Sequence, residues 1–247
     1  MCYRRYANES PTLQIHDRMH YRLPRHAFGV LSEYFMVARH FCLFAFIALA
    51  TVSSQLLAIV YAQEDLGIEV SPSAGSKSIT LNDGTRDAFS QLEFTDDVRR
   101  IYLRNCDIDD TSLKRLEGLK QLQYLSLEGS KIKGDGLVVL KSLPALKFLS
   151  LSGTKINDEA LEHLISLKKL TILQLDDTLV TDRGIAKLTS LARLEWLYLN
   201  HTKVTDASMP CLGKLRELRF LSLLGTSVTV TGVDELHAMV PSVRVRR

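Results

Sequence analysis

A repeat of 24 residues runs from residue 97 to residue 240 without insertion or deletion. Its six copies begin at Asp97, Gln121, Ala145, Lys169, Arg193 and Glu217. When each copy is numbered from 1 to 24, positions 2, 5, 7, 12, 17, 20 and 23 carry Leu, Ile, Val or Met in every copy. This periodicity constrains the fold more than any local motif, because each copy must bury its apolar side chains against its neighbours.

The spacing changes within each repeat, and the change predicts two kinds of secondary structure. Positions 5 and 7 alternate with polar or aromatic neighbours, as in Leu149-Ser150-Leu151, which is typical of a short strand with one buried face. Positions 17, 20 and 23 advance in steps of three, which indicates a helix with one apolar stripe. Each repeat is therefore expected to contribute one strand and one helix.

Two polar positions are expected to shape the turn between strand and helix. Position 14 is Asp in four repeats, and each carboxylate is placed to cap the first turn of the helix that follows it. Position 10 is small and mostly hydroxylated, so it is expected to satisfy backbone donors of the loop. The residues are Asp110, Asp158, Asp182 and Asp206 at position 14, and Cys106, Ser130, Thr154, Thr178, Thr202 and Thr226 at position 10.

The repeats resemble the leucine-rich repeat family, and Leu170–Leu191 shows the pattern LxxLxLxxTxITDxGLxxLxxL most fully. They are similar to bacterial relatives of the ribonuclease-inhibitor-like and cysteine-containing-like subclasses. The resemblance implies an α/β fold, a right-handed solenoid in a horseshoe arc with a parallel concave sheet and convex helices. Bending is expected on physical grounds too, because strands stack about 4.8 Å apart and packed helices need about 8–10 Å.

An apolar run without charge, FCLFAFIALATVSSQLLAIVYA, occupies residues 41–62 and predicts a leader helix. Arginines precede it and acids follow it, which keeps the N-terminus inside. Two interpretations remain open: a signal peptide cut after Ala62, or a retained anchor long enough to span the hydrocarbon core of about 30 Å. A start at Met36 in place of Met1 would give the short basic segment usual for a signal peptide. Both interpretations predict export, to a secreted or periplasmic form after cleavage or to a single-pass membrane protein with the repeats outside the cytoplasm.

Segments outside the repeats differ from them in composition, and the boundaries follow from those differences. Residues 63–76 are polar and are expected to be a linker, whereas alternation near Ile79 predicts a capping coil. The expected organisation is a basic N-terminal segment 1–40, the leader 41–62, the linker 63–76, an N-terminal cap 77–96, the repeats 97–240 and a C-terminal cap strand 241–247.

Strand alternation turns positions 4, 6 and 8 toward the predicted concave side of the sheet. Four aromatic residues share position 4, which is unusual for a surface exposed to solvent and typical of binding hot spots. Packing between neighbouring strands is the simpler explanation of the same column. The candidate binding residues are Arg100, Tyr102, Tyr124, Phe148, Ile172, Gln174, Asp176, Trp196, Tyr198 and Phe220.

Charge excludes one class of partner. Residues 1–62 hold six arginines, no lysine and three acids, so that the remaining residues carry 25 bases and 25 acids. The absence of net charge on these remaining residues argues against a nucleic-acid partner, because binding to a phosphate backbone needs a clustered basic field.

The sequence holds no spacing typical of a catalytic triad, a phosphate loop or a metal site, so we expect no enzyme activity, no cofactor and no metal. The predicted function is an extracytoplasmic module that binds a protein or peptide on its concave face. A structural protein of the cell envelope and a glycan-binding module are the alternatives. If residues 41–62 are retained, the membrane is a further partner.

Overall fold

The computed structural model describes residues 68–73 and 76–247, which belong to one compact unit, Gln55–Arg247. The predicted leader at 41–62, the basic segment before it and the alternative start at Met36 lie outside the described residues. Within the described part, the structure contains no helix with the length and hydropathy that a membrane span requires.

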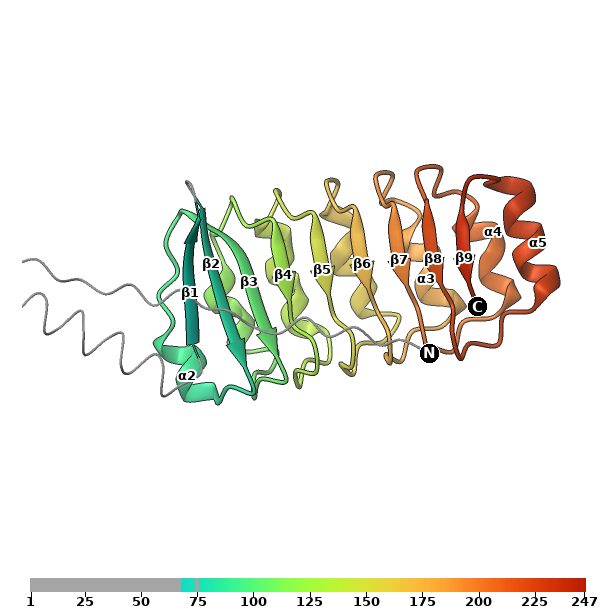
Figure 1. The fold of residues 1–247 in the computed structure, drawn as a ribbon. Coiled ribbons are helices and arrows are strands. Elements are labelled where there is room, and N and C mark those ends of the chain that lie inside the picture. The colour runs from blue at the N-terminus through green and yellow to red at the C-terminus, as the bar shows by residue number, and fades with distance from the viewer. Residues whose placement is uncertain (1–67, 74–75) are drawn as a thin grey trace, which may run out of the picture. The chain divides into compact units, whose positions relative to one another are not determined.

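One sheet contains nine strands of the described chain, in the order in which the sequence supplies them (Figure 1). The first pair is antiparallel and all later pairs are parallel. From β3 to β9 each strand residue pairs with the residue 24 positions further on, as Tyr124 does with Phe148. The strands are β1 (Ile68–Ser73), β2 (Ser76–Asn82), β3 (Val98–Arg104), β4 (Tyr124–Ser126), β5 (Phe148–Ser150), β6 (Ile172–Gln174), β7 (Trp196–Tyr198), β8 (Phe220–Ser222) and β9 (Arg244–Arg246).

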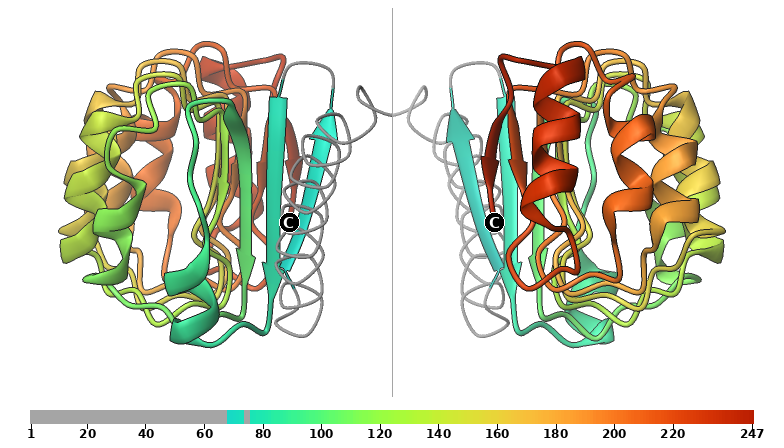
Figure 2. Two further views of the ribbon diagram at one scale, coloured as in Figure 1. Left: turned by 90° about the vertical axis from the view of Figure 1, so that its left-hand side faces the viewer. Right: turned by 90° about the vertical axis from the view of Figure 1, so that its right-hand side faces the viewer.

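The helical segments of the repeats lie along one face of this sheet (Figure 2). The first three repeats form 3₁₀ helices, labelled η, and the last three contain α-helix. Apolar residues in steps of three suit the 3₁₀ helix, which has three residues per turn. The segments are α2 (Arg86–Gln91) in the cap, then η1 (Ser112–Leu116), η2 (Asp135–Ser142), η3 (Ala160–Ser166), α3 (Asp182–Leu188), η4 (Asp206–Ser208), α4 (Met209–Leu212) and α5 (Val230–Met239).

The core lies between the sheet and the helices and is formed mainly by the seven periodic positions. All of these side chains are buried except Val233 and Met239, which are only partly buried in the last repeat. The predicted α/β solenoid with a parallel sheet is thereby confirmed in its layers and in its buried residues. The burial of these apolar side chains is the main contribution to the stability of a stacked repeat, because each coil buries them against its neighbours.

Position 9 turns the chain away from each strand in a left-handed backbone conformation. The φ angle there lies between 52° and 69° in all six repeats, at Asn105, Gly129, Gly153, Asp177, His201 and Gly225. This turn lets the position 9 N–H donate to the position 8 carbonyl of the next repeat, as from Asn105 to Glu128 at 2.7 Å. Gly, Asn and Asp tolerate such a conformation best, so the residue types themselves carried a signal that the repeat pattern alone did not reveal.

The position 10 threonine hydroxyls act mainly in the opposite sense to the prediction. The Oγ1 atoms of Thr154, Thr178, Thr202 and Thr226 donate to the carbonyl three residues earlier, at 2.5–2.7 Å. They therefore satisfy backbone acceptors of the loop, and of these four Thr226 also accepts from the backbone N–H of Val228, at 3.5 Å.

The prediction that each position 14 aspartate caps its own helix is wrong, because the carboxylate reaches across to the next repeat. Asp182 accepts from the N–H of Thr205 at 2.8 Å and from its hydroxyl at 2.7 Å. Asp158 binds Thr181 in the same way, and Asp206 binds Thr229. We call each of these arrangements an Asp–Thr clasp.

The threonine of each clasp is the residue that caps the following helix. Thr181 accepts from Arg183 N–H, Thr205 from Ala207 N–H and Thr229 from Gly232 N–H. Asp110 has no threonine to bind and accepts instead from the N–H groups of Lys133, Gly134 and Gly136. The aspartates therefore hold successive coils together.

The segment before the repeats is more ordered than expected. Residues 68–73, placed in the predicted linker 63–76, form β1 and pair with β2, with Ile68 opposite Leu81. Composition suggested a linker because this segment contains Pro72 and several serines, yet an edge strand accepts proline. At the other end, β9 lies within 241–247, with Val243 buried and Arg244 exposed.

Candidate binding surface

The face of the sheet opposite the repeat helices carries positions 4 and 6 of the repeat strands, with position 8 two residues further along the chain, and we call it the open face (Figure 2). Position 4 contributes Arg100, Tyr124, Phe148, Ile172, Trp196 and Phe220, in register on six neighbouring strands. Of the aromatic residues at this position, Trp196 is the most exposed, at 39%. All ten predicted binding residues lie on β3–β8 or directly after them.

Ile172 divides the aromatic column into two clusters. On one side the rings of Tyr124 and Phe148 stack with their centroids 6.1 Å apart. On the other side the rings of Trp196 and Phe220 lie 5.2 Å apart, and Tyr198 approaches Phe220 at 5.4 Å. Pair contacts of this kind stabilise neighbouring strands, so packing explains part of the column.

The first cluster is extended by a cation. The guanidinium carbon of Arg100 lies 5.2 Å from the centroid of the Tyr124 ring, within the range of a cation–π interaction. Arg104, four residues further along β3, pairs with Glu128 at 3.7 Å on the exposed edge of the same face. The part of the open face formed by the first repeats is therefore aromatic with paired charges.

Position 6 differs from the expectation that it faces solvent throughout. Ser126, Ser150 and Ser222 are 1–2% exposed, whereas Tyr102, Gln174 and Tyr198 at the same position are partly exposed. Larger neighbours cover the small serine side chains. The accessible part of the open face consists mainly of its large side chains.

A hydrogen-bonded chain runs across position 8. Asp176 accepts from the N–H of Asn200 at 2.7 Å, and the Asn200 amide oxygen accepts from Leu224 N–H at 2.9 Å and from the Ser222 hydroxyl at 2.7 Å. Burial raises the pKa of Asp176, the Asn200 N–H opposes that rise, and the neighbouring charge of Asp177 adds to it. Asp176 thus has a defined structural partner.

Two hollows flank these features. The first, of about 370 Å³, lies at the C-terminal end of the open face and is lined by Trp196, Arg219, Phe220, Ser242 and Arg244. The second, of about 580 Å³, lies on the helix side between η1 and η2, with Val138 and Val139 among its lining residues. The repeat pattern did not predict Arg219, Ser242 and Arg244 as part of the binding surface. Extending the 24-residue register by one more copy would have placed Arg244 in the aromatic column beside Phe220.

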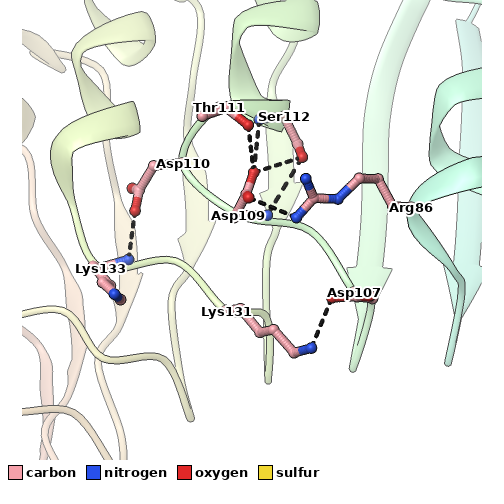
Figure 3. Close-up of polar contacts among 8 residues, drawn as sticks. All are labelled: Arg86, Asp107, Asp109, Asp110, Thr111, Ser112, Lys131 and Lys133. Atoms are coloured by element: carbon pink, nitrogen blue, oxygen red, sulfur yellow. Dashed lines mark hydrogen bonds and ion pairs between the residues drawn. The ribbon is translucent and has the colours of Figure 1, made fainter.

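A cluster of ion pairs and hydrogen bonds lies in the loops that follow β3 and β4 (Figure 3). Arg86 binds Asp109 at 2.6 Å, and Lys131 binds Asp107 at 2.9 Å. Hydrogen bonds from Thr111, Ser112 and Arg86 hold the pKa of Asp109 far below its usual range. These contacts tie the cap and the first two repeats together.

No group of three or more potential metal ligands occurs among residues 68–73 and 76–247.

The stacked coils with one strand and one helical segment each define a solenoid repeat protein. A family model described as a leucine-rich repeat region matches residues 76–240. That match covers well over half of the chain, and the chain therefore belongs to the leucine-rich repeat family. The resemblance seen in the sequence is confirmed.

Solved structures add a comparison of folds. Internalin C2 from Listeria monocytogenes is 22% identical, with a TM-score of 0.54, and the match covers 68% of this chain and 69% of that one. A leucine-rich repeat protein of Leptospira interrogans is 21% identical, with a TM-score of 0.49, and the match covers 62% of this chain and 38% of that one. No curated protein matches the chain. At such identities the likeness extends to the fold alone.

Proposed function

We propose that this chain is a non-catalytic binding module that holds a protein or peptide partner on its open face. The observation that carries the proposal is the aromatic column, in which the indole of Trp196 is 39% exposed. Aromatic side chains on a surface bury much area with few rotatable bonds, which is why they dominate binding hot spots. Repeat solenoids present extended surfaces of this type to their partners.

The sheet makes the surface rigid before a partner arrives. Each open-face residue from β3 to β8 sits on a strand paired on both sides, or directly after one, and over a core of buried leucines. A rigid surface loses little conformational entropy on binding, so more of the contact energy remains as affinity. The curvature expected from unequal strand and helix spacing would add contacts to a convex partner.

The proposed location is outside the cytoplasm. It rests on the charge bias around residues 41–62, where arginines lie before the apolar run and acids directly after it. Cleavage after Ala62 gives a secreted or periplasmic domain, and retention gives an anchored one. A partner in the same compartment follows from either outcome.

Substitution of the four aromatic residues at position 4 tests the proposal. We expect Tyr124→Ser, Phe148→Ser, Trp196→Ser and Phe220→Ser together to abolish capture of a protease-sensitive partner from the native cell, with the circular dichroism of the repeats retained. The matched control replaces four exposed apolar residues away from the open face by serine, namely Val138, Ile165, Leu179 and Val230. The control is expected to leave capture unchanged.

A second variant covers the case in which loss of ring packing weakens the fold. Gln174→Arg places a bulky charge in the centre of the open face and removes no aromatic contact. We expect it to reduce capture as well. If capture survives both the quadruple change and Gln174→Arg, the proposal is contradicted and a structural protein of the cell envelope is favoured. If the captured partner is a protease-resistant glycan, the sugar-binding alternative is favoured.

A further inference from the structure

We infer that the hollow beside Trp196 receives an acidic segment of the partner, with an apolar side chain against the rings of Trp196 and Phe220 and a carboxylate on Arg244. This inference rests on the proposed function and specifies the chemistry of the partner. It follows from the lining of the hollow and from the charges that surround it.

The hollow combines an apolar wall with a cation. Trp196 and Phe220 are neighbours in register on β7 and β8, and Arg244 follows them in the same column on β9. All three line the same space of about 370 Å³. An aromatic or aliphatic side chain fits against the rings, while the planar guanidinium of Arg244 suits a carboxylate through paired hydrogen bonds.

The charges near the hollow are unbalanced in favour of cations. The segments 192–195, 216–219 and 241–246 lead into β7, β8 and β9 and contain Arg193, Arg216, Arg219, Arg244 and Arg246 against Glu195 and Glu217. Arg219 pairs with Glu195 at 3.4 Å, whereas Arg244 has no ion pair with any of the described residues. Two of the three excess charges, Arg244 and Arg246, therefore lie on β9, where they are available to an acidic partner.

The remainder of the open face distinguishes an acidic peptide from a nucleic acid. Asp176 lies after β6 and the exposed Glu128 after β4, so a polyanion that ran along the sheet would meet two carboxylates. A peptide places its acids locally and avoids that repulsion. Residues 63–247 carry no net charge as a whole, which suits the same conclusion.

The chain contains a single tryptophan, so the emission of Trp196 reports directly on the hollow. We would titrate the full chain with a capped peptide that carries one phenylalanine between glutamates, and with its counterpart in which lysines replace the glutamates. A saturable change in emission is expected with the glutamate peptide, and binding of the lysine peptide is expected to be weaker by about tenfold or more. A single-stranded oligonucleotide is the third probe and is expected to bind more weakly than the glutamate peptide.

Charge reversal locates the site. Arg244→Glu is expected to lower the affinity for the glutamate peptide by about tenfold or more, because it removes one favourable contact and adds a repulsive one. Arg183→Glu makes an equal charge change on the exposed side of α3 and is expected to change the affinity for the glutamate peptide by no more than about twofold. The inference is overturned if the glutamate peptide gives no saturable change, if the lysine peptide or the oligonucleotide binds as tightly, or if Arg244→Glu has no effect.

The inference and the proposed function fail in different ways. If the aromatic quadruple substitution abolishes partner capture but Arg244→Glu does not alter peptide binding, the open face is a binding surface whose partner is not held by acids. If the quadruple substitution leaves capture intact, the open face itself is not the site.

Discussion

The first three repeats and the last three share one core but differ in their helices. Residues 97–168 form 3₁₀ helices whose first residues receive no side-chain cap from the preceding residue, at Thr111, Gly134 and Glu159. In residues 169–240 the helical segments are preceded by Thr181, Thr205 and Thr229, and each of these side chains accepts a backbone N–H. The buried positions alone therefore do not determine which type of helix forms.

The capping difference follows from the residues at positions 13 and 14. Where position 13 is threonine and the preceding repeat has aspartate at position 14, the clasp fixes the hydroxyl as a cap. The third repeat has Asn157 at position 13, and the second repeat offers Gly134 at position 14, so no clasp forms between them. Asn157 caps alone, by accepting from Ala160 N–H at 3.2 Å.

The largest expected effect tests the claim that the two halves share one core. Leu149→Ala in the first half and Leu173→Ala in the second should each lower the free energy of unfolding by about 2–5 kcal/mol, because both side chains are fully buried. Leu179→Ala, at a leucine that is 50% exposed, should change it by no more than about 0.5 kcal/mol. Equal losses for Leu173→Ala and Leu179→Ala in urea unfolding would refute the inward register.

The clasp should contribute less than a core leucine and more than a surface residue. Asp182→Ala leaves the Thr205 N–H and hydroxyl without their acceptor, at a cost of about 1–3 kcal/mol. Asp182→Asn keeps an oxygen for the N–H and adds a donor for the hydroxyl, so it should cost less. If chemical denaturation shows the two variants to be equally unstable, charge and not hydrogen bonding holds the clasp.

A glycine next to a clasp gives a prediction whose sign opposes helix propensity. Gly184 lies in α3, where alanine ordinarily stabilises a helix by up to about 1 kcal/mol. A Cβ at this position would overlap the carboxylate of Asp158 that binds Thr181. Gly184→Ala should therefore lower the unfolding temperature. In the background of Asp158→Ala the same change should lower it less, and an unchanged effect there would show that the carboxylate is not the obstacle.

The smallest expected effect depends on pH. Because the folded-state pKa of Asp176 is raised, the protonated form favours folding, and that contribution is present at acidic pH and lost as pH rises through the folded pKa. Asp176→Asn keeps an acceptor for Asn200 N–H and removes the charge. It should raise stability at neutral pH by roughly 0.5 kcal/mol or less, with no gain at acidic pH. A gain of equal size at both pH values would exclude desolvation of the carboxylate as its cause.

The repeat pattern predicted the strands, the helical segments and the buried side chains, because a fixed period leaves only one way to bury them all. It did not predict the partner of Asp182, since a residue 23 positions further along becomes a neighbour only after the coils stack. The aromatic column was also predicted from the repeat. Its division at Ile172 and the arginine that completes the hollow were not, because both depend on how the strands pack. The strand at Ile68–Ser73 was missed because its pairing with β2, and not its composition, makes it regular.

Photochemical cross-linking tests the central claim, that the open face of the sheet is the working surface. A photoreactive benzoylphenylalanine would replace Gln174 on β6 in one full chain and Ile165 on η3, which is 40% exposed, in another. Irradiation in the native cell should give a covalent adduct with a partner protein from position 174 and none from position 165. An adduct from position 165 alone would place the partner on the helices and contradict the account.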